Sequence, residues 1–125
     1  MNKNTIIWAL VIVVAVSSLV WLVRMPAKPG KLDSFASCIS AGGALFYGAF
    51  WCPHCQNQKA MFGSSAKLLP YIECSTPDGK SQLPICKDAG VEGYPTWEFG
   101  TSTRESGELS LARLSELTSC PLPQE

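Results

Sequence analysis

Hydrophobic residues dominate the first part of the chain without interruption. Residues 5–23 form a run of 19 residues that contains no charge. A helix rises about 1.5 Å per residue, so this run spans about 28 Å, close to the thickness of the hydrocarbon core of a bilayer. Trp8 and Trp21 lie near its two ends, where indole rings favour the membrane–water interface. We therefore expect residues 1–23 to form a single N-terminal transmembrane anchor.

A cleaved signal peptide is the alternative for the same segment. Lys3 would supply its basic region, and residues 15–17 (AVS) would be its small-residue cleavage site. The apolar region of a signal peptide is usually about 7–15 residues long, however, and this run continues to Val23. The length of the run favours the anchor.

Beyond the run, hydrophobic residues come in short segments. Residues 24–31 (RMPAKPGK) combine prolines, a glycine and charges, which indicates an extended linker. Residues 32–125 are enough for one small domain. A helix is expected from Asp33-Ser34, which can cap it, to Ala41, before two glycines.

The remaining segments alternate between strand and helix patterns. Residues 44–50 (ALFYGAF) are a continuous apolar run, typical of a strand that is buried on both faces. The segments expected after it are a helix from the motif at residue 52 to about Leu68, a strand at 71–74, a turn at 75–79, a short helix at 83–89, a strand pair at 96–99 and 101–104 with Gly100 at the bend, and an amphipathic helix at 110–117. This order predicts an α/β domain whose mixed central sheet has helices on both faces.

The composition narrows the classes of function. The chain has 125 residues and a formal net charge of zero, so it lacks the basic character of nucleic-acid-binding domains and no nucleic-acid partner is expected. Six cysteines in so short a chain indicate a disulfide framework, a metal site or redox chemistry.

The motif Cys52-Pro53-His54-Cys55 lies between the expected apolar strand and the helix that follows it. Pro53 suits the first position of a helix, where its missing N–H is not needed. Cys52 then lies at the helix amino terminus, where unpaired N–H groups and the helix dipole stabilise a thiolate. Cys55 follows one turn later and can close a disulfide with it. We expect Cys52 to be the nucleophile, Cys55 the resolving thiol, and a protonatable His54 to stabilise the thiolate and make the couple more oxidising.

A CxxC motif can also bind a metal, attach haem or form a structural disulfide. Zinc needs a second CxxC or a Cys/His pair at ligand spacing, but the other cysteines are isolated and His54 is the only histidine. Copper capture would use the two thiols alone. Haem attachment needs a histidine directly after the second cysteine, where Gln56 stands. A purely structural disulfide, and a solvated His54 without effect on the thiol, remain as alternatives. We expect no metal and no cofactor other than the Cys52–Cys55 disulfide.

Several segments in order resemble one known family. The stretches FYGAFWCPHCQNQKAMFG, YIECSTPDG, CKDAGVEGYPTW and SGELSLARL are similar to the thioredoxin-like domain attached to vitamin K epoxide reductase homologues of bacteria and plants. The similarity covers roughly residues 32–125. It implies a thioredoxin-like fold that exchanges disulfides with client proteins and is reoxidised by a membrane reductase that uses a quinone. The Pro-His dipeptide also resembles the strongly oxidising periplasmic disulfide oxidases.

The resemblance assigns roles to further residues. Pro95 precedes an expected strand, where a proline marks an edge, a bulge or a cis bond, and Gly93 alone would permit a bend with a trans proline. Thioredoxin-like folds carry a cis-proline beside the CxxC, so we favour the cis bond. Trp51, Tyr94 and Pro95 are then the expected substrate-binding residues.

The four other cysteines allow three disulfide connectivities. The resemblance pairs Cys74 with Cys86, across the turn after the second strand. Cys38 and Cys120, which are not features of the family, are then left to pair with each other. Phe46 is another departure, because it stands where thioredoxins proper carry a buried acid.

The cysteines indicate more strongly than the charges which side of the membrane the domain faces. Arg24, Lys28 and Lys31 follow the expected span and would favour a cytoplasmic domain, but long segments cross largely regardless of charge. Redox-active and structural disulfides indicate the periplasm or an equivalent oxidising lumen. We expect a membrane-anchored disulfide donor with a vitamin K epoxide reductase-like oxidase as its partner. The alternatives are a disulfide reductase or isomerase fed by a membrane electron donor, and a non-catalytic metal-binding or interaction domain.

Overall fold

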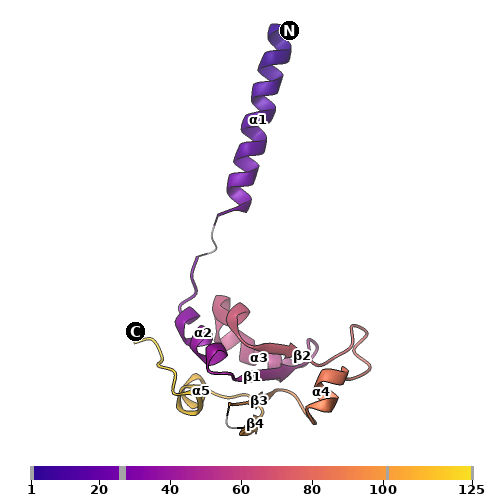
Figure 1. Ribbon diagram of the computed structural model, residues 1–125, viewed down its shortest axis with the longest axis vertical. Coiled ribbons are helices and arrows are strands. Elements are labelled where there is room, and N and C mark those ends of the chain that lie inside the picture. Colours follow the sequence, from indigo (N-terminus) through magenta and orange to yellow (C-terminus); the bar gives the residue numbers. More distant parts are fainter. Residues whose placement is uncertain (1, 26–27, 101, 125) are drawn as a thin grey trace.

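The computed structural model describes residues 2–25, 28–100 and 102–124. Its helices are α1 (Lys3–Val23), α2 (Asp33–Ala41), α3 (Pro53–Met61), the 3₁₀ helix η1 (Gly63–Leu68), α4 (Pro84–Asp88) and α5 (Leu111–Thr118). Its strands are β1 (Leu45–Gly48), β2 (Tyr71–Glu73), β3 (Thr96–Glu98) and β4 (Arg104–Ser106). Figure 1 shows α1 projecting from a domain that contains all the other elements.

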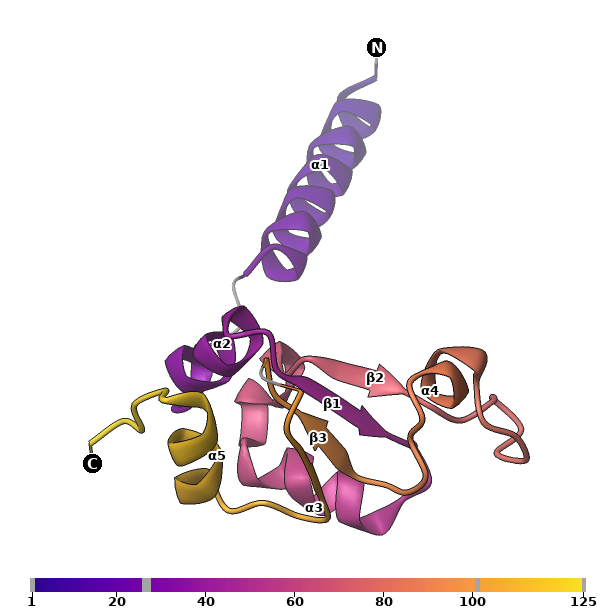
Figure 2. The same cartoon turned by 60° about the horizontal axis from the view of Figure 1, so that its bottom comes forward.

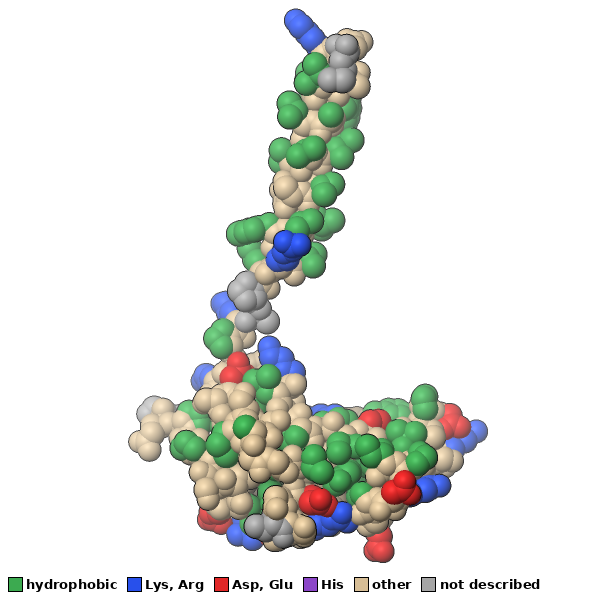
Figure 3. Space-filling model, viewed as in Figure 1, with side chains coloured by type: hydrophobic (Ala, Val, Ile, Leu, Met, Phe, Trp, Pro, Cys, Tyr) green, Lys and Arg blue, Asp and Glu red, His purple; other side chains and the backbone are tan. Residues whose placement is uncertain are grey.

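Helix α1 has the length and composition of a membrane-spanning helix, with a mean hydropathy of 2.8 over its most apolar part. None of its residues is buried, and Figure 3 shows hydrophobic side chains along the visible side of the rod. Its long apolar side chains therefore have no core to pack against. A membrane anchor and a signal sequence both fit these properties.

The sheet is mixed and has four strands in the order β2-β1-β3-β4. β1 pairs with β2 in parallel, with Phe46 opposite Tyr71, and with β3 in antiparallel fashion, with Phe46 opposite Trp97. β4 adds to the outer edge of β3 in antiparallel fashion. Figure 2 shows β2, β1 and β3 side by side, with α4 at one end of the sheet and α2 and α5 at the other.

Successive side chains of a strand point to opposite faces, and the two faces of β1 bury two different clusters. The larger cluster contains Phe46, stacked on Trp97 with ring centroids 4.5 Å apart, and the buried side chains of α2, α3 and α5. The smaller one contains Tyr47, Val91 and the Cys74 and Cys86 pair next to α4. β1 is thus covered by helices on both sides, as its continuous apolar sequence predicts.

The helical segment after the CxxC motif reaches Leu68 as expected, but it is α-helical only to Met61 and is a 3₁₀ helix from Gly63 to Leu68. The break coincides with Gly63, whose φ of +52° is left-handed and incompatible with an α-helix. The last strand begins at Arg104, because Ser102 has a φ of +60° and the turn is longer than a bend at Gly100. Thr101, its expected first residue, lies outside the described residues.

The expected cap of α2 also differs. Leu32 occupies the N-cap position without a side-chain hydrogen bond, and Asp33 is already the first helical residue. The carboxylate of Asp33 accepts a hydrogen bond from the backbone N–H of Gly30 at 2.9 Å. The side chain therefore ties the end of the linker to the domain. Residues 26 and 27 of the expected linker lie outside the described residues.

Candidate active site

The CxxC motif forms the junction between β1 and α3. Cys52 is the N-cap of α3, with an extended backbone, and Pro53 is the first residue of the helix. The backbone N–H of Cys55 points at Cys52 Sγ, with a nitrogen–sulfur distance of 3.4 Å. The two sulfurs are not bonded to each other. Cys52 Sγ therefore lies where the free N–H groups of a helix can stabilise negative charge.

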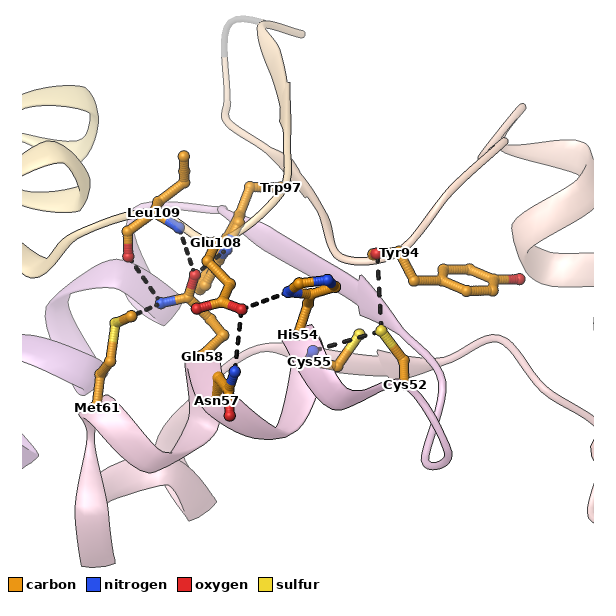
Figure 4. A network of polar contacts seen from close by, with 10 residues as sticks. All are labelled: Cys52, His54, Cys55, Asn57, Gln58, Met61, Tyr94, Trp97, Glu108 and Leu109. Carbon is orange, nitrogen blue, oxygen red and sulfur yellow. Dashed lines mark hydrogen bonds and ion pairs between the residues drawn. The ribbon is translucent and has the colours of Figure 1, made fainter.

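The loop before β3 brings a backbone carbonyl to the same sulfur. The Tyr94–Pro95 peptide bond is cis, and the carbonyl oxygen of Tyr94 lies 3.7 Å from Cys52 Sγ (Figure 4). Residues 52 and 94 thus meet although 42 positions separate them in the sequence. A chain bound at Cys52 would lie against this backbone.

Both active-site sulfurs are largely covered. Cys52 is 4% exposed and Cys55 is 1% exposed. Burial raises the pKa of the Cys55 thiol to about 12, and the neighbouring Cys52 contributes to the same shift. Cys55 is consequently held as a neutral thiol at physiological pH, which suits a resolving group and not an attacking one.

A groove opens beside Cys52. Its volume is about 490 Å³, and it is lined by Trp51, Tyr94 and residues of the 75–82 and 91–92 segments. The Trp51 indole N–H donates a hydrogen bond to Ser75 Oγ at 2.8 Å, and the ring meets Tyr94 edge-on at a centroid distance of 6.1 Å. Trp51 is still half exposed, so an apolar surface beside the sulfur is open to a bound chain.

His54 projects from the first turn of α3 toward a residue that the sequence did not indicate. His54 Nδ1 lies 2.5 Å from Glu108 Oε1, and the same oxygen accepts a hydrogen bond from the Asn57 amide at 3.2 Å (Figure 4). Both hydrogen bonds lower the pKa of Glu108, and the one from His54 has the larger effect. Nothing in the local sequence around Glu108 distinguishes it from other exposed acids, so only the fold brings it to the motif.

A buried amide holds the Glu108 segment in place. Gln58 is fully buried on α3; its Nε2 donates to the carbonyl of Leu109 at 2.9 Å, and its Oε1 accepts from the N–H of Leu109 at 2.7 Å. The indole N–H of Trp97 also donates to Oε1, at 3.4 Å. The backbone beside Glu108 is therefore attached to the active-site helix at two points (Figure 4).

The four remaining cysteines form two disulfides. One joins Cys74, after β2, to Cys86 in α4. The other joins Cys38, in α2, to Cys120, which follows α5. Because these four sulfurs are bonded in pairs, they are not available as metal ligands, and Cys52 and Cys55 are the two free thiols of the described residues.

Comparisons with known proteins agree with this arrangement. No protein-family model matches the chain. Over 96 residues it is 46% identical to thiol-disulfide oxidoreductase LTO1 of Arabidopsis thaliana, an alignment that covers 73% of this chain and 25% of the plant protein. Over 68 residues it is 37% identical to a thioredoxin domain-containing protein 5 homolog of Drosophila melanogaster, which covers 51% of this chain and 16% of the fly protein.

The chain thus spans a quarter or less of the length of these curated relatives. Together with the mixed four-stranded sheet and its covering helices, the relatives confirm the thioredoxin-like α/β fold.

Proposed function

We propose that this protein is a membrane-anchored thiol–disulfide oxidoreductase that donates the Cys52–Cys55 disulfide to client proteins. The reaction begins when a client thiolate attacks Cys52 Sγ. The Cys52–Cys55 bond breaks, a client–Cys52 mixed disulfide forms, and Cys55 takes up the electron pair and a proton. A second client thiolate then attacks the client sulfur of the mixed disulfide, which releases Cys52 as a thiolate and leaves the client oxidised.

The position of Cys52 carries this proposal. Its sulfur is at the amino terminus of α3, 3.7 Å from the Tyr94 carbonyl that precedes the cis-proline. The helix stabilises Cys52 as a leaving thiolate, and the Tyr94 backbone offers hydrogen bonds to an extended client chain. The names of the relatives, a thiol-disulfide oxidoreductase and a thioredoxin domain-containing protein, support the same class of reaction.

The direction of electron flow follows from the thiolate. A couple whose reduced form is stabilised is a good electron acceptor. Cys52 lies at a helix terminus with His54 in the first turn, and we expect both to favour the reduced form. The domain therefore oxidises clients and is left reduced. A reductase or isomerase is the alternative, and its potential would be lower.

Reoxidation then requires a partner in the membrane. The resemblance to domains attached to vitamin K epoxide reductase homologues supports an oxidase of that class as the partner. Helix α1 would hold the domain on the oxidising side of the membrane, close to such an enzyme. Confinement by a short linker raises the effective concentration of the two reactants for one another.

Mixed-disulfide trapping tests this proposal. A Cys55→Ser variant of the full chain keeps the Cys52 thiolate, which attacks the disulfide of an oxidised client in the reverse of the donation reaction. The variant lacks the Cys55 thiol that would release the client, so we expect it to accumulate disulfide-linked clients in its own membranes. A Cys52→Ser variant is the matched control and should trap none. Equal amounts of disulfide-linked client on the two variants, or none on either, would contradict the proposed reaction.

A further inference from the structure

The proposed reaction, on which this inference rests, makes Cys55 a difficult leaving group. Its sulfur must accept an electron pair when a client attacks Cys52, in surroundings that expose only 1% of the residue. Burial there raises the pKa of the thiol to about 12. A thiolate of such basicity leaves slowly, so the reaction is accelerated by any group that protonates Cys55 as the bond breaks.

The Tyr71 ring, on β2, lies beside the buried sulfur, and Lys59 of α3 lies against the same ring. A side chain at Gly48 would come within 2.7 Å of Tyr71 Cε2 and 3.0 Å of Cys55 Sγ, so the sulfur and the ring edge flank the same bare stretch of backbone. Lys59 lies one helical turn after Cys55 and therefore on the same face of α3. Its Nζ is 3.1 Å from the centroid of the Tyr71 ring. Cys55 and Lys59 thus border one aromatic ring.

The other polar groups near Cys55 are already engaged. The Tyr71 hydroxyl donates its proton to Glu73 Oε2 at 2.8 Å, and burial, followed by Glu73, raises the pKa of this phenol. The carboxylate of Glu73 also accepts from the backbone N–H of Phe50 at 3.2 Å and of Ser75 at 2.9 Å. The Glu73 carboxylate is therefore held in place as the acceptor of three hydrogen bonds.

Groups on the other elements do not supply a proton either. Phe46, on β1, carries no titratable group, and His54 points to Glu108. Cys52 Sγ is itself the atom that the client attacks, so it does not serve as the proton donor. Among the described residues, Lys59 is the remaining charged side chain that acts on Cys55, and its ammonium group carries protons that it can donate.

We propose that Lys59 is the proton donor to Cys55 in disulfide donation. As the client sulfur bonds to Cys52 Sγ and the Cys52–Cys55 bond breaks, the electron pair moves to Cys55 Sγ. The ammonium group of Lys59 transfers one proton to that sulfur and becomes a neutral amine. Lys59 is partly exposed, so water returns the proton before the next turnover.

The direction of this transfer is favourable. Burial lowers the pKa of Lys59 from its ordinary value of 10.5, whereas the pKa of Cys55 is about 12. A proton therefore moves from the ammonium to the newly formed thiolate downhill. The ammonium also faces the electron-rich ring of Tyr71, a contact that attracts cations and holds the group near the sulfur.

Two substitutions separate proton transfer from charge. Lys59→Met removes the charge and the proton, and Lys59→Arg keeps the charge on a group that does not release a proton. The full chain in detergent is oxidised, mixed with an excess of a peptide that carries two cysteine thiols, and quenched with acid at short times to measure the rate of reduction. Lys67→Met, which removes an exposed lysine of η1, is the matched control.

We expect both Lys59 variants to be reduced about 100-fold more slowly than the wild type, at the low end of the range for general acid catalysis. Lys67→Met should keep the wild-type rate. As a control, we measure the rate at which Cys52 is alkylated in the reduced proteins, a reaction in which Cys55 is not a leaving group. This rate should be the same in the variants and the wild type, which would show that the active site is intact.

The possible failures are distinguishable. A wild-type protein that does not react with the peptide overturns the proposed function. A reactive wild type with both Lys59 variants within about threefold of its rate overturns the role of Lys59. Lys59→Arg at the wild-type rate with Lys59→Met slow would show that charge alone acts, and would overturn proton transfer.

Discussion

His54 and Glu108 are 54 residues apart in the sequence, and yet His54 Nδ1 lies 2.5 Å from the Glu108 carboxylate. The contact joins the variable position of the CxxC motif to the segment that precedes α5. Gln58 fixes that segment by bonding to both backbone groups of Leu109. The imidazole beside the active-site thiol is therefore held by a distant part of the chain.

The Glu108 contact predicts a pH dependence of stability. The pKa of Glu108 is lowered by the hydrogen bond from His54 and then by that from Asn57. A carboxyl group whose pKa is lower in the folded state stabilises that state at neutral pH, and this stabilisation is lost as the pH falls from the unfolded value of about 4.3 through the folded one. Glu108→Gln should therefore be less stable than the wild type at pH 7.

Urea denaturation at several pH values measures this difference. We expect the gap between the wild type and Glu108→Gln to shrink steadily below about pH 4.3. Glu116→Gln, which removes an exposed acid of α5 that pairs with Arg113, serves as the comparison. A gap for Glu108→Gln that is the same at all pH values would show that the carboxylate has no role.

Gln58 should be one of the most sensitive polar residues of the domain. Gln58→Ala would leave the buried N–H and C=O of Leu109 and the indole N–H of Trp97 without their partner. An unpaired buried group costs about 1–3 kcal/mol, so the three groups together should lower the free energy of unfolding by at least about 3 kcal/mol. Gln56→Ala, at an exposed position on the same helix whose amide donates to the Phe50 carbonyl at 2.8 Å, should change it by about 1 kcal/mol or less. Similar losses at both positions would refute the prediction.

The sequence indicated the fold because its local signals agreed with the tertiary structure. The continuous apolar segment at 44–50 contains β1, and the Asp33–Ala41 helix has the predicted bounds. Pro53, between the apolar strand segment and a helical pattern, placed Cys52 at a helix amino terminus. In each case, the signal and the structure that it specifies involve the same few residues.

Contacts between distant segments left no such signal. The pairing of His54 with Glu108, and of Gln58 with Leu109, depends on how the segment before α5 returns to α3. The Tyr71 ring, which both Lys59 and Cys55 border, belongs to a different element, β2. Ser102 has a positive φ, and the last strand therefore begins later than expected. Because Ser102 is not a glycine, this conformation could not be predicted from the sequence either.

The disulfide between Cys38 and Cys120 should contribute more to stability than the one between Cys74 and Cys86. The first closes a separation of 82 residues and the second one of 12. In the chain-entropy model these loops correspond to about 4–5 and about 3 kcal/mol. We expect Cys38→Ala/Cys120→Ala to unfold at a lower denaturant concentration than Cys74→Ala/Cys86→Ala. The reverse order would mean that loop length does not govern their contributions.

Alkylation should distinguish the two active-site thiols of the reduced protein. Because burial raises the pKa of Cys55 to about 12, its thiolate is scarce below about pH 10. Iodoacetamide should therefore modify Cys52 alone in the native protein between pH 6 and about pH 9. In urea both cysteines should react, which controls for reagent access. Modification of Cys55 at a rate similar to that of Cys52 in the native state would contradict its role as a covered resolving thiol.

The reduction potential of the Cys52–Cys55 couple tests the proposed disulfide donor most directly. It is measured by equilibrating the full chain with glutathione buffers and quantifying the reduced and oxidised forms. We predict a value well above the potential of thioredoxin, about −270 mV, and toward that of strong periplasmic oxidants, about −120 mV. His54→Ser should shift the potential in the reducing direction. A potential at or below about −270 mV would contradict the proposal and indicate a disulfide reductase.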